Sequence, residues 1–421
     1  MSEFQPCKLG ELLRIEHGFA FKGEHFSDVG RHIVLTPGNF FEQGGFKPRP
    51  SKDRYYQSSY PPRYLLKKHA LIVAMTEQGE GLLGSAAIVP DDDQYLHNQR
   101  IGLVRAKKGA AETNFLYYLF NTSSVRQQIR NSSAGTKIRH TSPERMYGVD
   151  VVVPDLVTQQ KIAAILSTYD DLIANNQRRI SLLERMAEDI YREWFVRLRF
   201  PGHENVKVEK GVPEGWSLSA SNEAFDILGG GTPNTDEPMF WTGPIPFFTP
   251  KDATANFYAL NCEKNISEKG LNACSTQLFP KNTIFITARG TVGKLALAAV
   301  PMAMNQSCYA LRPKHAVAVY FHYLAIRDSI NYIKSVSKSG VFDNIVMDTF
   351  KNVPLLLPPQ VLMDRFNEAV ASLFIQVANL LERNRLLAST RDSLLPRLIS
   401  GKLSVDALDI RFPPGMGESG T

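Results

Sequence analysis

The stretch TQQKIAAILSTYDDLIANNQRRISLLERMAEDIYREWFVRLR, from Thr158 to Arg199, decides the fold of this chain. It contains neither proline nor glycine, and apolar side chains return along it at alternating steps of four and three residues once Asn176 is counted with them. This spacing is the heptad repeat of a helix that packs an apolar seam against a second helix. The seam residues predicted for this first helix are Ile162, Leu166, Ile173, Asn176, Ile180 and Leu183.

A second stripe of the same kind lies 204 residues further along the chain. Its predicted seam residues are Phe366, Val370, Val377, Leu380, Asn384 and Leu387. Arg391 continues the stripe, and Pro396 is expected to kink or end the helix near its last turn. The simplest partner for each stripe is the other one, and a zipper between two copies of the chain is the alternative. Seam asparagines commonly fix register and orientation, so we predict that role for Asn176 and Asn384, with docking of another protein as the alternative.

The two stripes belong to a repeat that covers most of the chain. Thr36-Pro37 is echoed by Thr249-Pro250, 213 residues later, and Val153-Pro154 by Leu357-Pro358, 204 residues later. The matches between these points keep their order while the offset falls, as small loop deletions in the second copy would produce. We therefore predict two strand-rich mixed copies, each followed by a long helix, and the linker between them permits either helix orientation. The predicted boundaries are 1–153, 154–204 for the first helix and linker, 205–357, 358–403 for the second helix, and 404–421 for a tail.

Composition narrows the function classes only a little. The net charge of +6 suits a polyanionic partner, although mildly basic proteins are common. The four cysteines form no C-x-x-C pair, so we expect reduced thiols rather than disulfides or a zinc knuckle. The N-terminus lacks a signal-peptide pattern, and no apolar run reaches the roughly 20 residues of a membrane span, which predicts a cytoplasmic protein.

Loops rich in small polar and basic residues separate the predicted strands in both copies. Arg, Lys, Gln, Asn, Ser and Thr are the residues that hydrogen-bond phosphates and base edges, and glycine lets a backbone come close to them. The candidate DNA contacts are Thr76, Gln78, Lys137, Arg139, His140, Lys251, Arg289, Thr291, Lys294, Lys338 and Asn344. The alternative is that the glycines only shape hairpins and the basic residues are solvated. Asn98-Gln99 and Asn305-Gln306 recur in both copies, which favours structural amides over base contacts.

Motifs of catalysis are missing from the sequence. It has no phosphate-binding G-x-x-x-x-G-K-[ST] loop, no H-E-x-x-H, no histidine pair at metal-ligand spacing, and no Asp/Asn-Pro-Pro-aromatic run of an amino-methyltransferase. We predict no catalytic residue and no metal site on this chain. Two rival classes remain open: a DNA methyltransferase or endonuclease with an unrecognised centre, and an assembly adaptor that binds only proteins.

The helix carries a further signal in its residue types. The run from Gln160 to Ile173, with Tyr191–Val196 after it, resembles the central conserved helix of the specificity subunits of type I restriction enzymes. Val212-Pro213-Glu214-Gly215-Trp216, followed by Gly230-Gly231-Thr232-Pro233, is similar to the start of a target recognition domain in that family. The first copy lacks this Pro-x-Gly-Trp sequence.

The resemblance implies an α+β fold, with two strand-rich mixed target recognition domains joined by two long helices that form an antiparallel coiled coil. Each domain would read half of a split site in double-stranded DNA, and the helices would set the gap between the halves. Two methyltransferase subunits and restriction or motor subunits would be the partners. S-adenosylmethionine, ATP and magnesium would bind to those partners, with no cofactor on this chain and no membrane contact.

Overall fold

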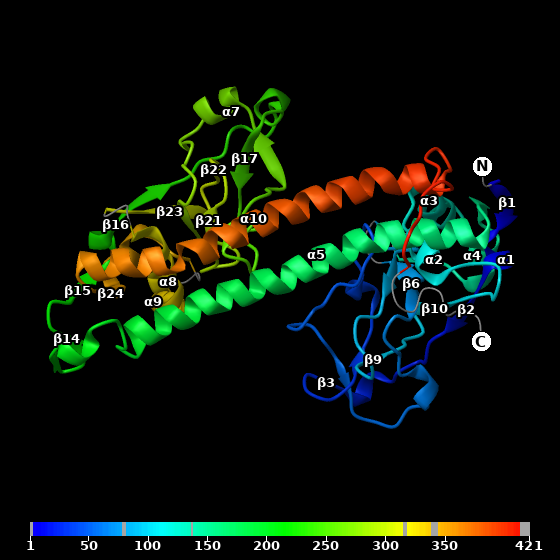
Figure 1. Cartoon of the computed structure of the whole chain (residues 1–421), viewed down its shortest axis with the longest axis horizontal. Coiled ribbons are helices and arrows are strands. Elements are labelled where there is room, and N and C mark those ends of the chain that lie inside the picture. The colour runs from blue at the N-terminus through cyan, green and yellow to red at the C-terminus, as the bar shows by residue number, and fades with distance from the viewer. Residues whose placement is uncertain (1–2, 78–80, 136–137, 315–317, 338–343, 413–421) are drawn as a thin grey trace. The chain divides into compact units, whose positions relative to one another are not determined.

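The computed structural model of the chain describes residues 3–77, 81–135, 138–314, 318–337 and 344–412. It divides into two compact units, and each unit includes a stretch of both long helices (Figure 1). Unit 1 consists of residues 1–172 and 387–421, and unit 2 of residues 173–386. The five segment boundaries predicted from the sequence stay a prediction.

The centre of unit 1 is a four-stranded antiparallel sheet in the order β2-β10-β6-β8. Its strands are β2 (Leu13–His17), β10 (Ile101–Ala106), β6 (Leu71–Ala74) and β8 (Ala86–Ile88). Strand β6 is buried along its whole length, so its alternating side chains enter two cores. Leu71 and Val73 join a core that includes helix residue Phe115, whereas Ile72 and Ala74 join one that includes Leu35.

The remaining elements of unit 1 cover this sheet and extend it. A smaller sheet has the order β3-β5-β4-β9, and separate strand pairs are β1-β12 and β11-β7. The bounds are β1 (Gln5–Lys8), β3 (Phe26–Ser27), β4 (Ile33–Val34), β5 (Tyr55–Tyr56), β7 (Thr76–Glu77), β9 (Tyr95–Leu96), β11 (Arg139–His140) and β12 (Asp150–Val153). The short helices are α1 (Leu9–Leu12), α2 (Thr113–Phe120), α3 (Ser123–Asn131) and α4 (Pro143–Tyr147).

Unit 2 repeats this plan. Its larger sheet has the order β16-β23-β20-β21-β18, and its smaller sheet has the order β19-β17-β22. The bounds are β16 (Phe225–Gly229), β17 (Ile245–Phe248), β18 (Tyr258–Ala259), β19 (Lys264–Ile266), β20 (Ile284–Thr287), β21 (Leu295–Ala298), β22 (Ala303–Met304) and β23 (Cys308–Pro313). Strand β20 takes the place of β6: Ile284 and Ile286 join one core, and Phe285 joins another.

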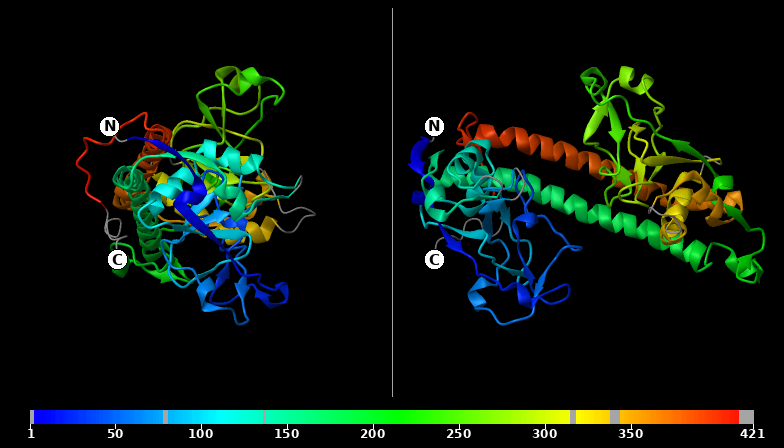
Figure 2. Two further views of the ribbon diagram at one scale, coloured as in Figure 1. Left: turned by 90° about the vertical axis from the view of Figure 1, so that its right-hand side faces the viewer. Right: turned by 180° about the vertical axis from the view of Figure 1, so that it is seen from behind.

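The edges of unit 2 also match those of unit 1. Strands β15 (Ser217–Ala220) and β24 (Pro354–Leu357) pair as β1 and β12 do, and β13 (Val208–Glu209) pairs with β14 (Val212–Pro213). The short helices are α6 (Ser221–Ala224), α7 (Glu268–Asn272), α8 (Val319–Asp328) and α9 (Ile330–Ser337). The elements of each unit are seen from two further directions in Figure 2. The α+β fold predicted from the sequence is confirmed.

The long helices are α5 (Leu156–Tyr191), which continues as a π-helical segment (Arg192–Val196), and α10 (Gln360–Ile399). They run antiparallel within each unit. In unit 2, Asn176 contacts Asn384 while the Trp194 ring, later in α5, packs 5.6 Å from Phe366, earlier in α10. In unit 1, Lys161 Nζ donates to Asp406 O at 2.9 Å, beyond the end of α10. The open question of helix orientation is therefore settled in each unit.

The predicted seam residues differ in their burial. The buried ones are Ile162, Leu166, Asn176, Ile180, Phe366, Val370, Val377 and Leu380. The half-buried ones are Ile173, Leu183, Asn384 and Leu387. Between Val370 and Val377 the fully buried side chain is Phe374, which the predicted seam does not include. The reason is that α10 packs on the core of unit 2 as well as on α5, so its buried face is wider than a two-helix seam.

Candidate nucleic-acid interface

In unit 1, two segments that carry predicted DNA contacts lie side by side. Strand β7 follows β6 and pairs antiparallel with β11, which lies in the second loop. The Thr76 hydroxyl is 3.1 Å from His140 Nδ1, although 64 residues separate the two in sequence. Thr76 is buried, Arg139 is half-buried and His140 is exposed. Gln78 and Lys137, which we also predicted as contacts, lie outside the described residues.

The hairpin loop of unit 1 (residues 75–84) is held from inside by an acidic side chain. Glu77 is buried, and its Oε2 accepts hydrogen bonds from the backbone N–H groups of Leu82 at 3.0 Å and Leu83 at 2.9 Å. A carboxylate that accepts backbone N–H bonds closes a loop in the same way that it caps a helix. We therefore assign Glu77 to the structure of the loop rather than to ligand contact.

Arg126 of α3 holds the same loop from the other side, and the sequence analysis did not identify it. Its Nε donates to Leu83 O at 2.9 Å, its Nη1 to Glu42 O at 3.0 Å, and its Nη2 to Gly81 O. Because every one of these acceptors is a backbone carbonyl, no pattern in the side chains could have indicated the contact. Arg126 therefore ties helix α3 directly to the hairpin loop.

In unit 2, the hairpin loop (residues 288–293) is shorter and is closed by one threonine. Thr287 exchanges backbone bonds with the far end of the loop: its N–H donates to Lys294 O at 2.9 Å, and its O accepts from Gly293 N–H at 2.8 Å. Its hydroxyl donates to Thr291 O and accepts from Lys294 N–H at 2.9 Å. Gly290 and Gly293 have φ of 78° and 80°, a left-handed conformation that favours glycine, so both shape this hairpin.

A second loop of unit 2 lies against this hairpin. The Thr291 hydroxyl donates to Pro250 O at 3.4 Å, and Lys294 Nζ donates to Ala253 O at 3.2 Å. Lys251, between those two acceptors, is exposed and pairs with exposed Glu263 at 3.4 Å. Three predicted contact residues, Lys251, Thr291 and Lys294, therefore gather at one place in unit 2.

In each unit, one backbone hydrogen bond holds a second segment of the chain beside the hairpin loop, and the two bonds are equivalent in the repeat. Thr141 N–H donates to Met75 O at 2.9 Å in unit 1, and Ile345 N–H donates to Ala288 O at 3.0 Å in unit 2. Half-buried Asn344 directly precedes Ile345 in the chain, and exposed Arg289 directly follows Ala288. The two predicted contact residues therefore flank this backbone bond. Lys338 lies outside the described residues. The two units therefore share a surface built from a hairpin loop and a neighbouring segment, which we call the loop surface. It consists of residues 75–77 and 81–84 with 132–135 and 138–141 in unit 1, and of residues 288–294 with 344–345 and 249–253 in unit 2.

The recurring asparagines have a structural role. Asn98 Oδ1 accepts from Arg100 N–H at 3.2 Å, and Asn305 Oδ1 accepts from Ser307 N–H at 3.1 Å, so each closes the same tight turn. A glycine, Gly18 in unit 1 and Gly230 in unit 2, passes so close to this turn that a Cβ atom would lie 2.2 Å from Asn98 and 2.3 Å from Asn305.

The two loop surfaces differ in chemistry. Unit 2 presents the exposed cations Lys251, Arg289 and Lys294, and Arg289 makes no hydrogen bond or ion pair with another described residue. Unit 1 presents Arg139 and His140 beside a buried acid. Such groups can hydrogen-bond phosphates and base edges.

Over the described ranges, no group of three or more His, Cys, Asp and Glu side chains could hold a metal ion. No helix in the described part of the chain is long and apolar enough to cross a membrane.

Comparison with known families identifies this arrangement. The sequence model of the type I restriction modification DNA specificity domain matches residues 1–185 and 213–362. The chain belongs to this family. Its function is therefore DNA recognition as a non-catalytic specificity subunit of type I restriction–modification, and an active centre of its own is not favoured.

Individual relatives of the specificity family span most of the chain. The type I restriction enzyme MjaIX specificity subunit of Methanocaldococcus jannaschii is 26% identical over 313 residues, which cover 72% of this chain and 71% of that protein. The HindI specificity subunit of Haemophilus influenzae is 23% identical, with 74% and 82% covered. A crystal structure of a type I S subunit from M. genitalium covers 94% of this chain and 96% of its own, with a TM-score of 0.60 at 15% identity, so it shares the fold.

Proposed function

We propose that the two loop surfaces are the DNA contacts of this specificity subunit, and that each reads one half of a split site in double-stranded DNA. One observation carries the proposal: both units build the loop surface with the same backbone bonds but present different side chains on it. A repeated scaffold with two sets of side chains suits two different half-sites.

The proposal extends to the partners. A specificity subunit without a catalytic centre needs partners that modify and cut DNA. We infer that two adenine methyltransferase subunits, with S-adenosylmethionine, and restriction or motor subunits, with ATP and magnesium, assemble on this chain in the cytoplasm. The family match supports this inference.

A selection experiment tests the DNA contacts. The full chain, co-purified with the methyltransferase subunit of its host, would be incubated with a library of duplexes that carry two randomised half-sites and gaps differing by single base pairs. Sequencing of the bound duplexes gives both half-sites and the gap. We expect Arg289→Ala to relax one half-site and Arg139→Ala to relax the other, with about a tenfold or greater loss of affinity for each where a base contact is lost.

Matched controls come from the opposite end of the same sheets. Lys68 and Lys281 occupy equivalent positions just before β6 and β20, and both are exposed. Replacing either by alanine should leave both half-sites unchanged. If Arg289→Ala and Arg139→Ala behave like these controls, the loop surfaces are not the contacts. Binding that does not weaken as salt rises would count against phosphate contacts altogether.

A further inference from the structure

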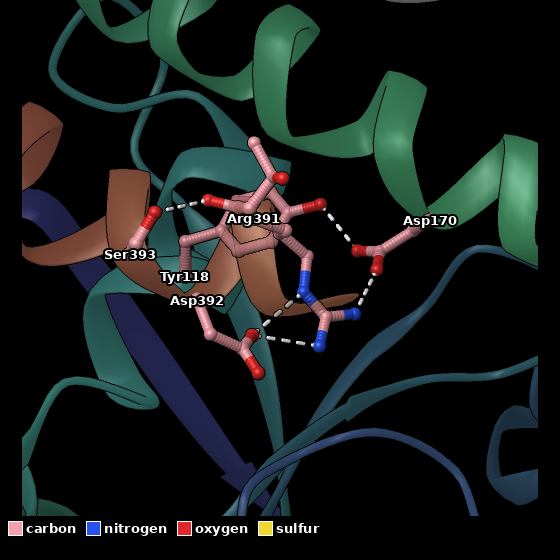
Figure 3. A network of polar contacts seen from close by, with 6 residues as sticks. Tyr118, Asp170, Arg391, Asp392 and Ser393 are labelled. Carbon is pink, nitrogen blue, oxygen red and sulfur yellow. Dashed lines mark hydrogen bonds and ion pairs between the residues drawn. The ribbon is translucent and has the colours of Figure 1, made fainter. Parts of the chain in front are cut away.

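In unit 1, three elements meet at one polar cluster (Figure 3). The Tyr118 hydroxyl of α2 donates to Asp170 Oδ2 of α5 at 2.5 Å. The Arg391 guanidinium of α10 donates through Nη1 to Asp170 Oδ1, and through Nε and Nη2 to Asp392 Oδ1 at 2.9 and 2.8 Å. Asp170 thus receives one bond from the globular part of the unit and one from the second long helix.

The cluster is partly shielded from water. Tyr118 is 4% exposed, and the side chains of Asp170 and Arg391 are 30% and 27% exposed. Burial and the nearby Asp170 raise the pKa of Tyr118 far above its usual value, so its hydroxyl remains a donor. Tyr118 itself belongs to an apolar core that includes Phe115 and Leu166. Apolar packing has no strict direction, whereas hydrogen bonds to a charged group require defined geometry.

The three equivalent positions in unit 2 carry no charged side chain. The offsets of the repeat put Tyr323 at the place of Tyr118, Phe374 at that of Asp170, and Ala187 at that of Arg391. All three are buried, and the rings of Tyr323 and Phe374 lie 6.1 Å apart. Unit 2 has its charged contact at other positions, where Arg327 Nε of α8 donates to Glu188 Oε1 of α5 at 2.7 Å. The cluster of Tyr118, Asp170 and Arg391 is therefore particular to unit 1.

The cluster is connected to the loop surface of unit 1 through two helices. Tyr118 lies on α2, and α3 follows directly with Arg126, which holds the carbonyls of Gly81 and Leu83. Asn121, between the two helices, also bonds Ala86 just after the hairpin loop, accepting from its N–H at 3.1 Å. Tyr118 is thus linked to α5 by its hydrogen bond to Asp170, and to the hairpin loop through α3 and the hydrogen bonds of Arg126.

We propose that Tyr118, Asp170 and Arg391 are positioning residues that fix the loop surface of unit 1 on the long helices and so restrict the gap between half-sites that the protein accepts. The proposal rests on the proposed function. It assigns the cluster no contact with DNA.

The library selection described above tests this role when it is read for the gap. We expect Tyr118→Phe and Asp170→Asn to keep both half-site sequences. The enrichment of the preferred gap over gaps one base pair longer or shorter should fall about tenfold, the size of a typical coupling effect. A merely structural role would lower yield or stability and leave the gap distribution unchanged. Glu382→Gln, which removes an exposed ion pair with Arg385 on α10, is the matched control and should change nothing.

The double variant Asp170→Phe with Arg391→Ala separates stability from positioning, because it installs the residues of unit 2. We expect it to melt at a temperature near that of the wild type but to accept a shifted or broader set of gaps. A wild-type gap distribution in a folded double variant, or in Tyr118→Phe, would overturn the proposal. If the wild type itself selects no paired half-sites, the proposed function fails instead, so the two failures are distinguishable.

Discussion

At equivalent positions of the junction between the globular part and the long helices, unit 1 has charged side chains and unit 2 has aromatic rings, beside which unit 2 has its own ion pair between Arg327 and Glu188. In unit 1, Asp170 joins Tyr118 and Arg391. In unit 2, Phe374 stacks on Tyr320 at 4.2 Å and on Phe257 at 5.0 Å. Partial burial of a charge pair contributes little net stability but requires one geometry, whereas a buried aromatic cluster supplies stability directly. The comparison teaches that the repeat conserves the place of the junction and not its chemistry.

The largest effect is expected at the aromatic junction. Phe374→Ala removes a fully buried ring and leaves a cavity among its neighbours, and we expect the free energy of unfolding of unit 2 to fall by about 4 kcal/mol. Urea unfolding followed by tryptophan fluorescence measures this, because all three tryptophans, Trp194, Trp216 and Trp241, lie in unit 2.

The neighbouring residue supplies the control for this prediction. Ile375 is 54% exposed on the same helix, so Ile375→Ala should cost less than about 0.5 kcal/mol. If Phe374→Ala cost no more than Ile375→Ala, the aromatic cluster would not be the source of stability at this junction.

The same contrast shows what the sequence could and could not predict. The heptad spacing predicted two long helices with seams such as Ile180 and Val377, because periodicity is a local signal. It missed Phe374, because a heptad repeat describes packing against one partner helix, whereas α10 packs against both α5 and the core of unit 2. The repeat predicted equivalent units, since offsets in sequence persist through small deletions.

The candidate site was predictable by residue type but not by assembly. Polar and basic loops pointed to the loop surfaces, but the pairing of β7 with β11 joins residues 64 positions apart, and no local pattern specifies it. The roles of Glu77 and Arg126 could not be predicted from the sequence for a related reason. Both side chains hydrogen-bond backbone atoms, which every residue carries.

A second prediction concerns an acid in unit 2 that has no counterpart in the charge cluster of unit 1. Glu184 is buried, its Oε1 accepts from Phe257 N–H at 2.6 Å, and burial raises its pKa to about 7. The hydrogen bond from Phe257 N–H and the nearby Arg327 lower this pKa, and Glu188 raises it further, each less than burial does. Unfolded, the group titrates near pH 4.3. Between these values the folded chain keeps a proton that the unfolded chain has lost, so stability falls as pH rises and stays low above pH 7.

Glu184→Gln should therefore remove this slope. At pH 8 we expect the variant to be more stable than the wild type by up to about 3 kcal/mol, and below pH 4 the two should be similar. Urea unfolding across pH 4–8 measures the difference. Glu209→Gln, at an exposed site in unit 2, should retain the wild-type slope. Parallel stability curves for Glu184→Gln and the wild type would show that Glu184 is ionised at no cost.

The smallest effect is expected at the seam itself, where a third chemistry, an amide pair, lies between the long helices in unit 2. Asn176 Nδ2 donates to Asn384 Oδ1 at 2.9 Å, and Asn176 is 8% exposed. Asn384→Ala leaves a buried amide without its partner, so we expect a loss of about 1 kcal/mol in tryptophan-monitored urea unfolding. Replacing both residues by leucine should restore that stability or exceed it, because neither polar group is then left unpaired.

The leucine pair should, however, lose the restriction to one register, since leucines pack with many offsets and a paired amide packs with one. Broadened amide signals along α5 in the double variant, set against sharp signals in the wild type, would separate register from stability; sharp signals in both would leave the asparagines with no role in register.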